Sequence, residues 1–306
     1  MKLVECVLNV SEGRDRDRID QIAGVLRGHA ACALLDVHSD WDHHRSVLTV
    51  AGEPRAVLER VLDACRIAVE RIDLRLHHGV HPRIGAVDVV PFIPLQGLTL
   101  SECADLAREF ARRIAAELDL PVFLYEEASA GPHRITLPEL RRGGLEALFG
   151  PDAGGCRLRP DFGPPTPHAT AGAVAVGARA ILVAFNVLLA TSQASLAREI
   201  ARRIRQSNGG LPAVRALGLL LESRRQAQVS MNLIDYHITP PLRVVEAIRR
   251  ECDRLGIGID SSELVGLAPR AALPADPAGE LLLKCFGPCR VLEARIFEEL
   301  GVELQL

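Results

Sequence analysis

The sequence has few aromatic residues and no long uninterrupted apolar run. One Trp and two Tyr stand among 306 residues, so aliphatic side chains must fill the interior. No stretch reaches the roughly 20 apolar residues that a membrane-spanning helix needs. The first residues, Met1-Lys2-Leu3-Val4-Glu5, lack a charged leader followed by an apolar segment. These absences predict a cytoplasmic protein with no membrane partner.

An excess of positive charge is also missing, because the net charge is −3. Arginines are numerous, but acidic residues are interspersed with them on helix-like segments such as 15–27. That pattern is typical of solvated helix faces. We therefore expect no nucleic-acid partner.

Closely paired cysteines are nearly absent. The eight cysteines stand at positions 6, 32, 65, 103, 156, 252, 285 and 289, and only the last two are close in sequence. A structural zinc site usually takes two close pairs. Most of these cysteines lie in apolar patterns and are interpreted as small buried hydrophobic residues with reduced thiols.

Apolar and charged residues alternate in patterns that predict two similar halves. In the first half, strands are expected at 3–10, 31–37, 45–51, 84–93 and 121–125, with helices around 19–26, 57–69 and 99–118. In the second half, strands are expected at 180–189, 216–221, 228–234 and 262–267, with helices at 196–204 and 241–255. Both halves follow the order βαββαβ, with an extra helix and strand at the end of the first half, so we expect an α+β fold of two tandem ferredoxin-like sandwich subdomains.

Pro and Gly concentrate between Gly150 and Gly177, which predicts a linker or a ligand-covering loop. We place the boundary between the subdomains at its end, giving domains 1–178 and 179–306.

Three histidines and an arginine gather in the segment His77-His78-Gly79-Val80-His81-Pro82-Arg83-Ile84-Gly85. Glycine permits tight turns, and Pro82 stiffens the chain after His81. Imidazole moves protons readily near neutral pH, so the cluster indicates proton-transfer chemistry. A polar surface turn is the alternative for any single histidine here.

These residues resemble the glutamate formimidoyltransferase family. Besides the histidine segment, residues 5–14 (ECVLNVSEGR), 40–46 (DWDHHRS) and 88–94 (DVVPFIP) are similar to family segments. Further matches, in order along the chain, are Leu124-Tyr125, Thr136-Leu137-Pro138, Pro160-Asp161-Phe162-Gly163-Pro164, Ala184-Phe185-Asn186-Val187, Gln228-Val229-Ser230-Met231-Asn232-Leu233 and Glu263-Leu264-Val265-Gly266-Leu267. No cyclodeaminase-like segment follows, so the resemblance is to the transferase unit.

The resemblance implies transfer of a formimidoyl group from N-formimino-L-glutamate to tetrahydrofolate, the co-substrate, in histidine degradation. It implies two subdomains with a ligand tunnel between them, a homodimer and no metal. His81 would be the catalytic histidine. The expected folate-binding loop comprises Gly163, Pro164, Pro165, Thr166, Pro167, His168, Ala169, Thr170, Ala171 and Gly172.

The substrates carry carboxylates, which guanidinium groups bind through paired hydrogen bonds. Arg45 and Arg83 are therefore candidate anchors, although Arg45 has an ion pair with an acid such as Asp42 as its alternative. Asn9 and Glu12 are candidates to bind an amide or a pterin edge, or to cap the first helix. His43 is a further candidate for the site lining. A rival hypothesis places a metal ion among the histidines at 43, 44, 77 and 81.

The chain departs from the family pattern at Val80, Leu188 and Ala171, where polar or aromatic residues are usual. Each change removes a partner of the kind that orients a ligand. Two alternatives therefore stand beside formimidoyl transfer: formyl exchange between glutamate and folate with an altered donor site, or a catalytically inactive folate-binding protein.

Overall fold

The computed structural model describes residues 1–129, 135–149 and 158–304, which form two compact units, Met1–Arg179 and Ala180–Leu306. Both units combine a β-sheet with helices, so the predicted α+β class is confirmed. Among the described residues, no helix combines the length and apolar character needed to cross a bilayer.

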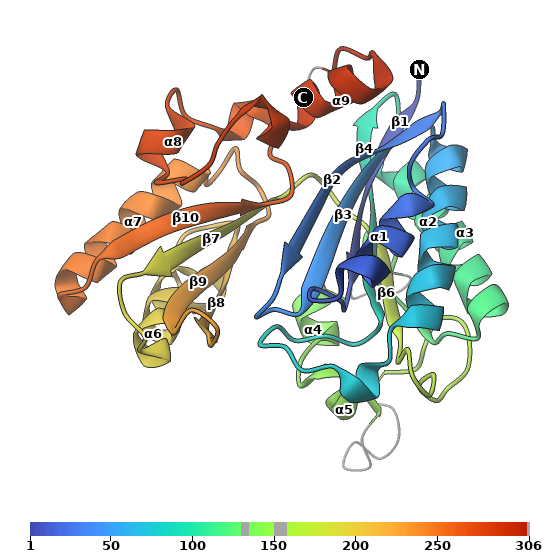
Figure 1. Ribbon diagram of the computed structural model, residues 1–306, viewed down its shortest axis with the longest axis horizontal. Helices are drawn as coiled ribbons and strands as arrows, with labels where there is room; N and C mark the ends of the chain where they lie inside the picture. The colour runs from blue at the N-terminus through green and yellow to red at the C-terminus, as the bar shows by residue number, and fades with distance from the viewer. Residues whose placement is uncertain (130–134, 150–157, 305–306) are drawn as a thin grey trace. The chain divides into compact units, whose positions relative to one another are not determined.

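The first unit is built on a six-stranded sheet with the strand order β2-β3-β1-β4-β6-β5 (Figure 1). Strands β2, β3, β1 and β4 pair antiparallel, whereas β6 pairs parallel with both β4 and β5. Its strands and helices are β1 Leu3–Val10, α1 Arg16–Gly24, β2 Cys32–Asp40, β3 Arg45–Gly52, α2 Pro54–Arg71, β4 Val87–Gln96, α3 Leu100–Leu118, β5 Val122–Glu126, α4 Leu137–Leu140, α5 Gly144–Phe149 and β6 Val174–Ala178. A 3₁₀ turn, Leu74–Leu76, precedes the histidine segment.

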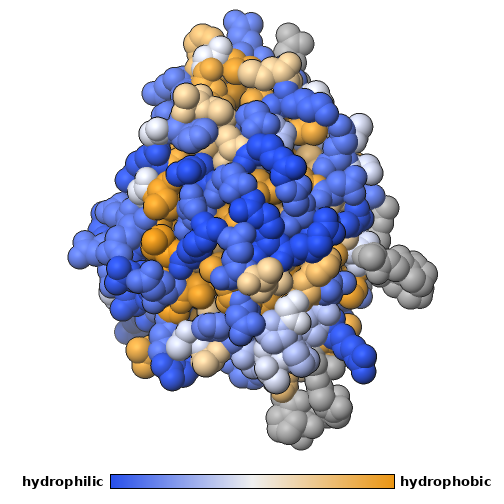
Figure 2. All heavy atoms as spheres, turned by 90° about the vertical axis from the view of Figure 1, so that its right-hand side faces the viewer, coloured by the Kyte–Doolittle hydropathy of each residue, from blue (hydrophilic) through white to orange (hydrophobic). Residues whose placement is uncertain are grey.

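Three helices cover one face of this sheet. Buried side chains of α1, α2 and α3 pack with the residues of β1 that point the same way, Val4, Cys6, Leu8 and Val10. Thr99 and Glu102 form the expected capping box at the start of α3, each binding the backbone N–H of the other. The solvent side of α2 and α3 is largely hydrophilic (Figure 2), as expected from the ion pairs Arg66–Glu117 and Arg113–Glu59 that join the two helices.

The second unit contains a four-stranded antiparallel sheet with the order β10-β7-β9-β8. Its strands and helices are β7 Val183–Leu189, α6 Ala194–Ile204, β8 Val214–Leu221, β9 Gln226–Leu233, α7 Pro241–Leu255, β10 Ile259–Val265, α8 Pro277–Glu280 and α9 Leu292–Leu300. Short 3₁₀ turns occur at Gln206–Asn208, Arg270–Ala272 and Pro288–Arg290. The two units share an arrangement in which the first strand of a βαββαβ run lies between the third and the fourth. In the first unit β1 lies between β3 and β4, and in the second unit β7 lies between β9 and β10.

One strand was not expected. The stretch 150–177 was predicted to resist regular structure, and residues 150–157 lie outside the described residues, but Val174–Ala178 forms β6. This strand completes the sheet by joining β4 to β5. The strand predicted to begin at Ala180 begins instead at Val183.

Most cysteines behave as predicted for small hydrophobic side chains. Cys6, Cys32, Cys65, Cys103 and Cys252 are buried with free thiols. Cys285 and Cys289 are both exposed and also free. Cys156 lies outside the described residues.

Candidate active site

The loop that carries His81 is fixed on two sides. On one side, the backbone N–H of Val80 donates to Asp42 O at 3.0 Å, in the turn between β2 and β3. On the other, the N–H of Ala86 donates to Ala171 O, and that of Ala173 donates to Ile84 O, both at 2.9 Å. The histidine segment, the β2–β3 turn and the expected folate loop therefore meet in the first unit.

Gly85 allows the loop to approach residues 172–173 closely. A Cβ atom at this position would overlap the carbonyl oxygen of Ala173. Gly79 has the same role on the other side, where a Cβ atom would overlap the carbonyl oxygen of His43. The two glycines that bracket the histidines are thus required by backbone contacts.

Replacing Gly85 with Ala is expected to lower the free energy of unfolding by about 1–3 kcal/mol or more, because backbone must move to admit the methyl group. Gly24→Ala is the matched control, since a Cβ atom there meets nothing within 4 Å. The control should change stability by no more than about 1 kcal/mol. Urea denaturation of both variants measures the difference, and equal midpoints would contradict the close approach.

Two of the histidines are structural. The rings of His44 and His77 stack at 4.3 Å, and a ring nitrogen of His77 lies 2.8 Å from His44 O. His44 also places Nε2 3.2 Å from the Glu12 carboxylate and Nδ1 3.2 Å from His78 O. These contacts tie the β2–β3 turn to the histidine segment.

Glu12 serves this framework and the start of α1. Its Oε1 atom accepts hydrogen bonds from the backbone N–H groups of Arg14 (2.9 Å) and Asp15 (3.1 Å), and Arg18 pairs with Oε2 at 3.2 Å. Burial alone would raise the pKa of Glu12, but the hydrogen bonds from His44 and the two amides lower it to about 2. Glu12 is therefore a buried, ionised carboxylate occupied by internal partners.

His81 lies against the guanidinium group of Arg45. The Nη1 atom of Arg45 is 2.9 Å from His81 Nε2, and His81 Nδ1 is 2.9 Å from Pro82 O. A guanidinium can only donate, and a carbonyl can only accept. Nε2 is therefore the unprotonated nitrogen, while Nδ1 carries the proton and donates it to Pro82 O.

The surroundings of His81 keep its imidazole neutral. Burial lowers the pKa of His81 well below its usual value, and the positive charges of Arg45 and Arg141 act in the same direction, as does His43. The ring of His43 lies 5.6 Å from that of His81. A neutral imidazole with a lone pair on Nε2 is the form that accepts a proton.

Two residues near Arg45 were not singled out from the sequence. Asp88, on β4, is 1% exposed, accepts a hydrogen bond from Ile84 N at 2.8 Å and pairs with Arg141. A lone carboxylate in the apolar run Val87–Val90 was a signal that could have found it. Arg141 follows α4 and has no comparable local signal, because its position depends on Asp88.

Arg45 and Arg141 both have unused hydrogen-bonding capacity. The Nε atom of each guanidinium is buried and has no partner among the described residues. Burial and the charge of Arg141 lower the pKa of Arg45 to about 10, so the group remains charged at neutral pH. Two partly buried cations, each with a free Nε–H group, make an anion-binding environment beside His81.

The other predicted site residues have identifiable positions. Arg83 donates from Nε to His77 Nδ1 at 3.3 Å and pairs with Glu146 at 3.2 Å. His43 is buried, and its backbone N–H donates to Asp40 Oδ1 at 2.6 Å. Asn9 is buried on β1, and its Nδ2 donates to Val7 O at 2.8 Å.

The expected folate-binding loop, 163–172, is closed at its C-terminal end. His168 and Gly172 exchange two backbone hydrogen bonds, of 2.8 and 3.0 Å, and His168 Nδ1 accepts from Ala171 N at 3.0 Å. All of residues 163–170 are exposed or partly exposed, while Ala171 and Gly172 are buried. Residues 163–170 are thus accessible to solvent, while residues 171–172 are held in place beside the histidine segment.

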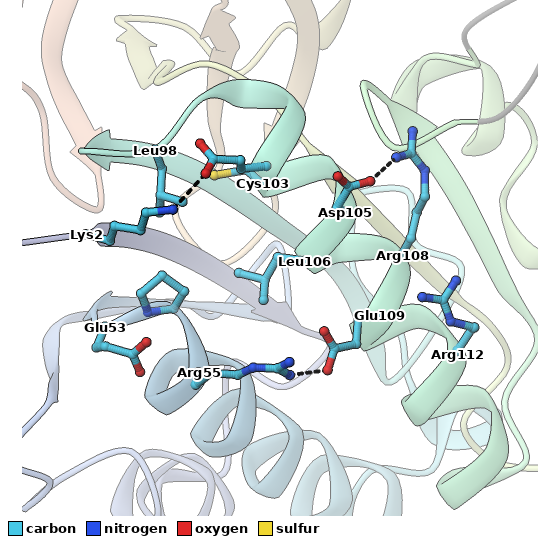
Figure 3. Close-up of a pocket in the computed structure, with 12 residues that line it drawn as sticks. Lys2, Glu53, Arg55, Leu98, Cys103, Asp105, Leu106, Arg108, Glu109 and Arg112 are labelled. Carbon is cyan, nitrogen blue, oxygen red and sulfur yellow. Dashed lines mark hydrogen bonds and ion pairs between the residues drawn. The ribbon is translucent and has the colours of Figure 1, made fainter.

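A separate hollow of about 560 Å³ lies on the helical face, between Lys2 and the starts of α2 and α3 (Figure 3). Its charged side chains pair with one another, as in Lys2–Glu102, Arg55–Glu109 and Arg108–Asp105. None of the candidate site residues lines it. Within the described ranges, no group of three or more His, Cys, Asp or Glu side chains is arranged to hold a metal ion.

The fold and site define a chain of two α/β units whose first unit holds a neutral histidine beside two arginines. Comparison with known proteins gives the family. Residues 3–179 match the model of the formiminotransferase domain, N-terminal subdomain, and residues 184–279 match the formiminotransferase domain. The chain belongs to the formiminotransferase family.

Curated relatives cover most of the chain. A glutamate formimidoyltransferase of Streptococcus pyogenes serotype M1 is 41% identical over 276 residues, which are 89% of this chain and 91% of that protein. Another, of Thermoplasma acidophilum, is 38% identical and covers 99% of this chain and 100% of its own length. A formimidoyltransferase-cyclodeaminase of Rattus norvegicus is 42% identical over 89% of this chain, which spans 51% of that protein.

Proposed function

We propose that this protein transfers a formimidoyl group from N-formimino-L-glutamate to tetrahydrofolate, giving 5-formimidoyltetrahydrofolate and L-glutamate. The observation that carries this proposal is the neutral His81 with its Nε2 lone pair held against Arg45. The proposal is also supported by relatives of this chain that are named glutamate formimidoyltransferases. The protein is thus a one-carbon transferase of histidine degradation.

The proposed reaction exchanges one nitrogen for another at the formimidoyl carbon. A folate nitrogen attacks this carbon to form a tetrahedral intermediate, and the bond to the glutamate nitrogen then breaks. His81 Nε2 takes the proton from the attacking nitrogen and delivers it to the departing amine. A group that is neutral near pH 7 suits both steps. The imidazole returns the proton that it takes, so the reaction needs no other proton donor or acceptor.

Arg45 and Arg141 would bind a carboxylate of the glutamate donor. Each has a buried Nε–H group without a partner in the described structure, and the two charges act on each other and on His81. A carboxylate with two oxygen atoms can accept from both guanidinium groups. The donor's formimidoyl carbon would then lie near the imidazole.

Tetrahydrofolate is the proposed co-substrate, and loop 163–172 is its proposed binding segment. Ala171 in the loop and Ala173 directly after it bond to Ala86 and Ile84, at the end of the histidine segment, which supports this proposal. His43, Arg83 and Asn9 are proposed to line the site, and Glu12 to hold the β2–β3 turn in place. We further propose that the protein acts as a cytoplasmic homodimer and requires no metal.

One assay tests this function. Purified protein is mixed with tetrahydrofolate and either formiminoglutamate or formylglutamate, and formation of the substituted folate is followed spectroscopically. We expect turnover with formiminoglutamate as the donor and none with formylglutamate. Turnover only with formylglutamate would replace the proposal with formyl transfer. Inertness with both donors, with measurable folate affinity, would leave a folate-binding protein.

A further inference from the structure

Two cysteines of the second unit are exposed, unlike the other cysteines in the described part of the chain. Cys285 and Cys289 both carry free thiols and are separated only by Phe286-Gly287-Pro288. They lie beyond residues 184–279, the stretch that matches the formiminotransferase domain model. The proposed transfer reaction involves neither of them.

The loop that carries both thiols is held at each end by the same stretch of chain. Before the loop, the backbone N–H of Ser262 on β10 donates to Leu282 O at 2.9 Å. After it, the N–H of Ala268 donates to Arg290 O at 3.1 Å. Residues 283–289 therefore form a short loop with fixed ends beside β10, an edge strand of the second sheet.

Phe286 anchors the centre of this loop, because its partly buried side chain packs against the apolar core of the second unit. Its neighbour Cys285 is exposed, so the two side chains point in opposite directions, as in an extended chain. Gly287 is also extended, with φ −163° and ψ 175°. A side chain at position 287 would therefore point outward, to the same side as the thiol of Cys285.

The thiol of Cys289 turns back to this outer side. Pro288 opens a tight turn in which the N–H of Arg290 donates to Gly287 O at 2.9 Å. A Cβ atom built on Gly287 would lie 3.8 Å from Cys289 Sγ. Because that Cβ atom would point the same way as the side chain of Cys285, both thiols lie on the outer side of the loop.

The chain between the two thiols can bend without losing a backbone hydrogen bond. Position 287, beside the Sγ of Cys289, is about 7 Å from Cys285 along an extended chain. A disulfide requires Cβ atoms about 4 Å apart, so the chain must bend for the bond to form. The backbone N–H groups of Cys285, Phe286 and Gly287 donate no hydrogen bond within the described residues, and nothing of this kind opposes the bend.

We propose that Cys285 and Cys289 form a reversible intramolecular disulfide on exposure to a peroxide. One thiol attacks the peroxide, whose O–O bond breaks as an S–O bond forms and one water is released. The second sulfur then attacks this sulfenic acid, forming the S–S bond and releasing a second water. The two sulfur atoms together give two electrons to the peroxide, and a dithiol reductant returns them.

Burial confines this chemistry to the exposed pair. Oxidation requires access of the oxidant to sulfur, and Cys65 and Cys103 are fully buried in the core of the first unit. Burial also raises the pKa of the Cys65 thiol far above its usual value, which keeps it protonated and unreactive. A disulfide that forms in a reducing compartment is usually transient and responds to redox conditions.

Trypsin provides a direct test, because it cuts after Lys284 and Arg290 and releases both cysteines in one peptide, residues 285–290. The reduced full-length protein is treated with hydrogen peroxide, unfolded in N-ethylmaleimide, digested and analysed by mass spectrometry. This peptide should lose both of its alkylatable thiols and two hydrogen atoms, and dithiothreitol should restore it. The tryptic peptide 61–66, which contains only Cys65, is the internal control and should remain alkylatable.

Cys285→Ser and Cys289→Ser complete the test. Each removes one exposed thiol, so the melting temperature should not change, but the loss of two hydrogen atoms should disappear in both variants. In the wild type, at a peroxide dose that leaves Cys65 alkylatable, two alkylated cysteines in peptide 285–290 would overturn the proposal. Oxygen adducts on its separate sulfur atoms, or disulfide-linked dimers of the chain, would do the same. None of these outcomes depends on the proposed transferase activity.

Discussion

Replacing His81 with Ala is expected to lower kcat by about 10²- to 10⁴-fold, the usual contribution of a general acid–base group. The imidazole is the neutral acceptor at the meeting point of the β2–β3 turn and the histidine segment, with Arg45 on its Nε2. Without it, the attacking nitrogen loses its proposed proton acceptor. Steady-state assays with saturating tetrahydrofolate measure the loss.

The matched control is His78→Ala. His78 lies three residues away in the same loop and is exposed, and its contact with His44 is made by its backbone oxygen. Its loss should leave kcat within a few-fold of wild type. Affinity for 5-formyltetrahydrofolate should survive in both variants, and added imidazole should restore part of the activity of His81→Ala. Undiminished turnover in His81→Ala would remove this residue from the mechanism.

Local sequence patterns were sufficient to predict most elements of the fold. The β2–β3 hairpin, the capping box at Thr99 and the start of α7 at Pro241 each depend on residues close together in sequence. Strand β6 was missed because Val174–Ala178 is short, rich in Ala and Gly, and directly follows a Pro/Gly-rich stretch. Its strand character comes from parallel pairing with β4 and β5, which no local pattern reveals.

The site residues, like the elements of the fold, divide into those that local sequence predicts and those that depend on distant contacts. His81, Arg45 and Gly85 stand in distinctive segments, and the structure brings their segments together. Arg141 occurs in the ordinary polar sequence Leu140-Arg141-Arg142-Gly143, and its place beside His81 depends on Asp88, 53 residues earlier. A buried ion pair between distant segments leaves no periodic trace in the sequence. A single acidic residue inside an apolar strand, such as Glu5 or Asp88, is the one type of sequence signal that could have indicated a buried polar position.

Arg45 contacts the nitrogen that the proposed reaction uses as its base. His81 Nε2 accepts a hydrogen bond from Arg45, so its lone pair is not free to take a proton. A donor carboxylate is a stronger acceptor for a guanidinium than a neutral imidazole is. Binding of the donor should therefore draw Arg45 away from Nε2 and free the base only when substrate is present.

Arg45→Met is accordingly expected to have two effects. The KM for the glutamate donor should rise about 10- to 100-fold, because a charge-assisted hydrogen bond to its carboxylate is lost. The pKa of His81 should also rise toward its usual value, since one of the positive charges that lower it has gone, while burial, Arg141 and His43 still act. Arg75→Met, an exposed arginine paired with Asp73, is the control.

The pH profile separates these effects. In the proposed mechanism catalysis requires neutral His81, so kcat/KM should fall on the acid side as pH drops through the pKa of this residue. In the wild type that pKa is well below 6.5, and the profile should stay flat from neutral pH down to mildly acidic pH. In Arg45→Met the acid limb should move to higher pH. A higher KM with an unmoved acid limb would mean that Arg45 anchors the donor without controlling the protonation of His81.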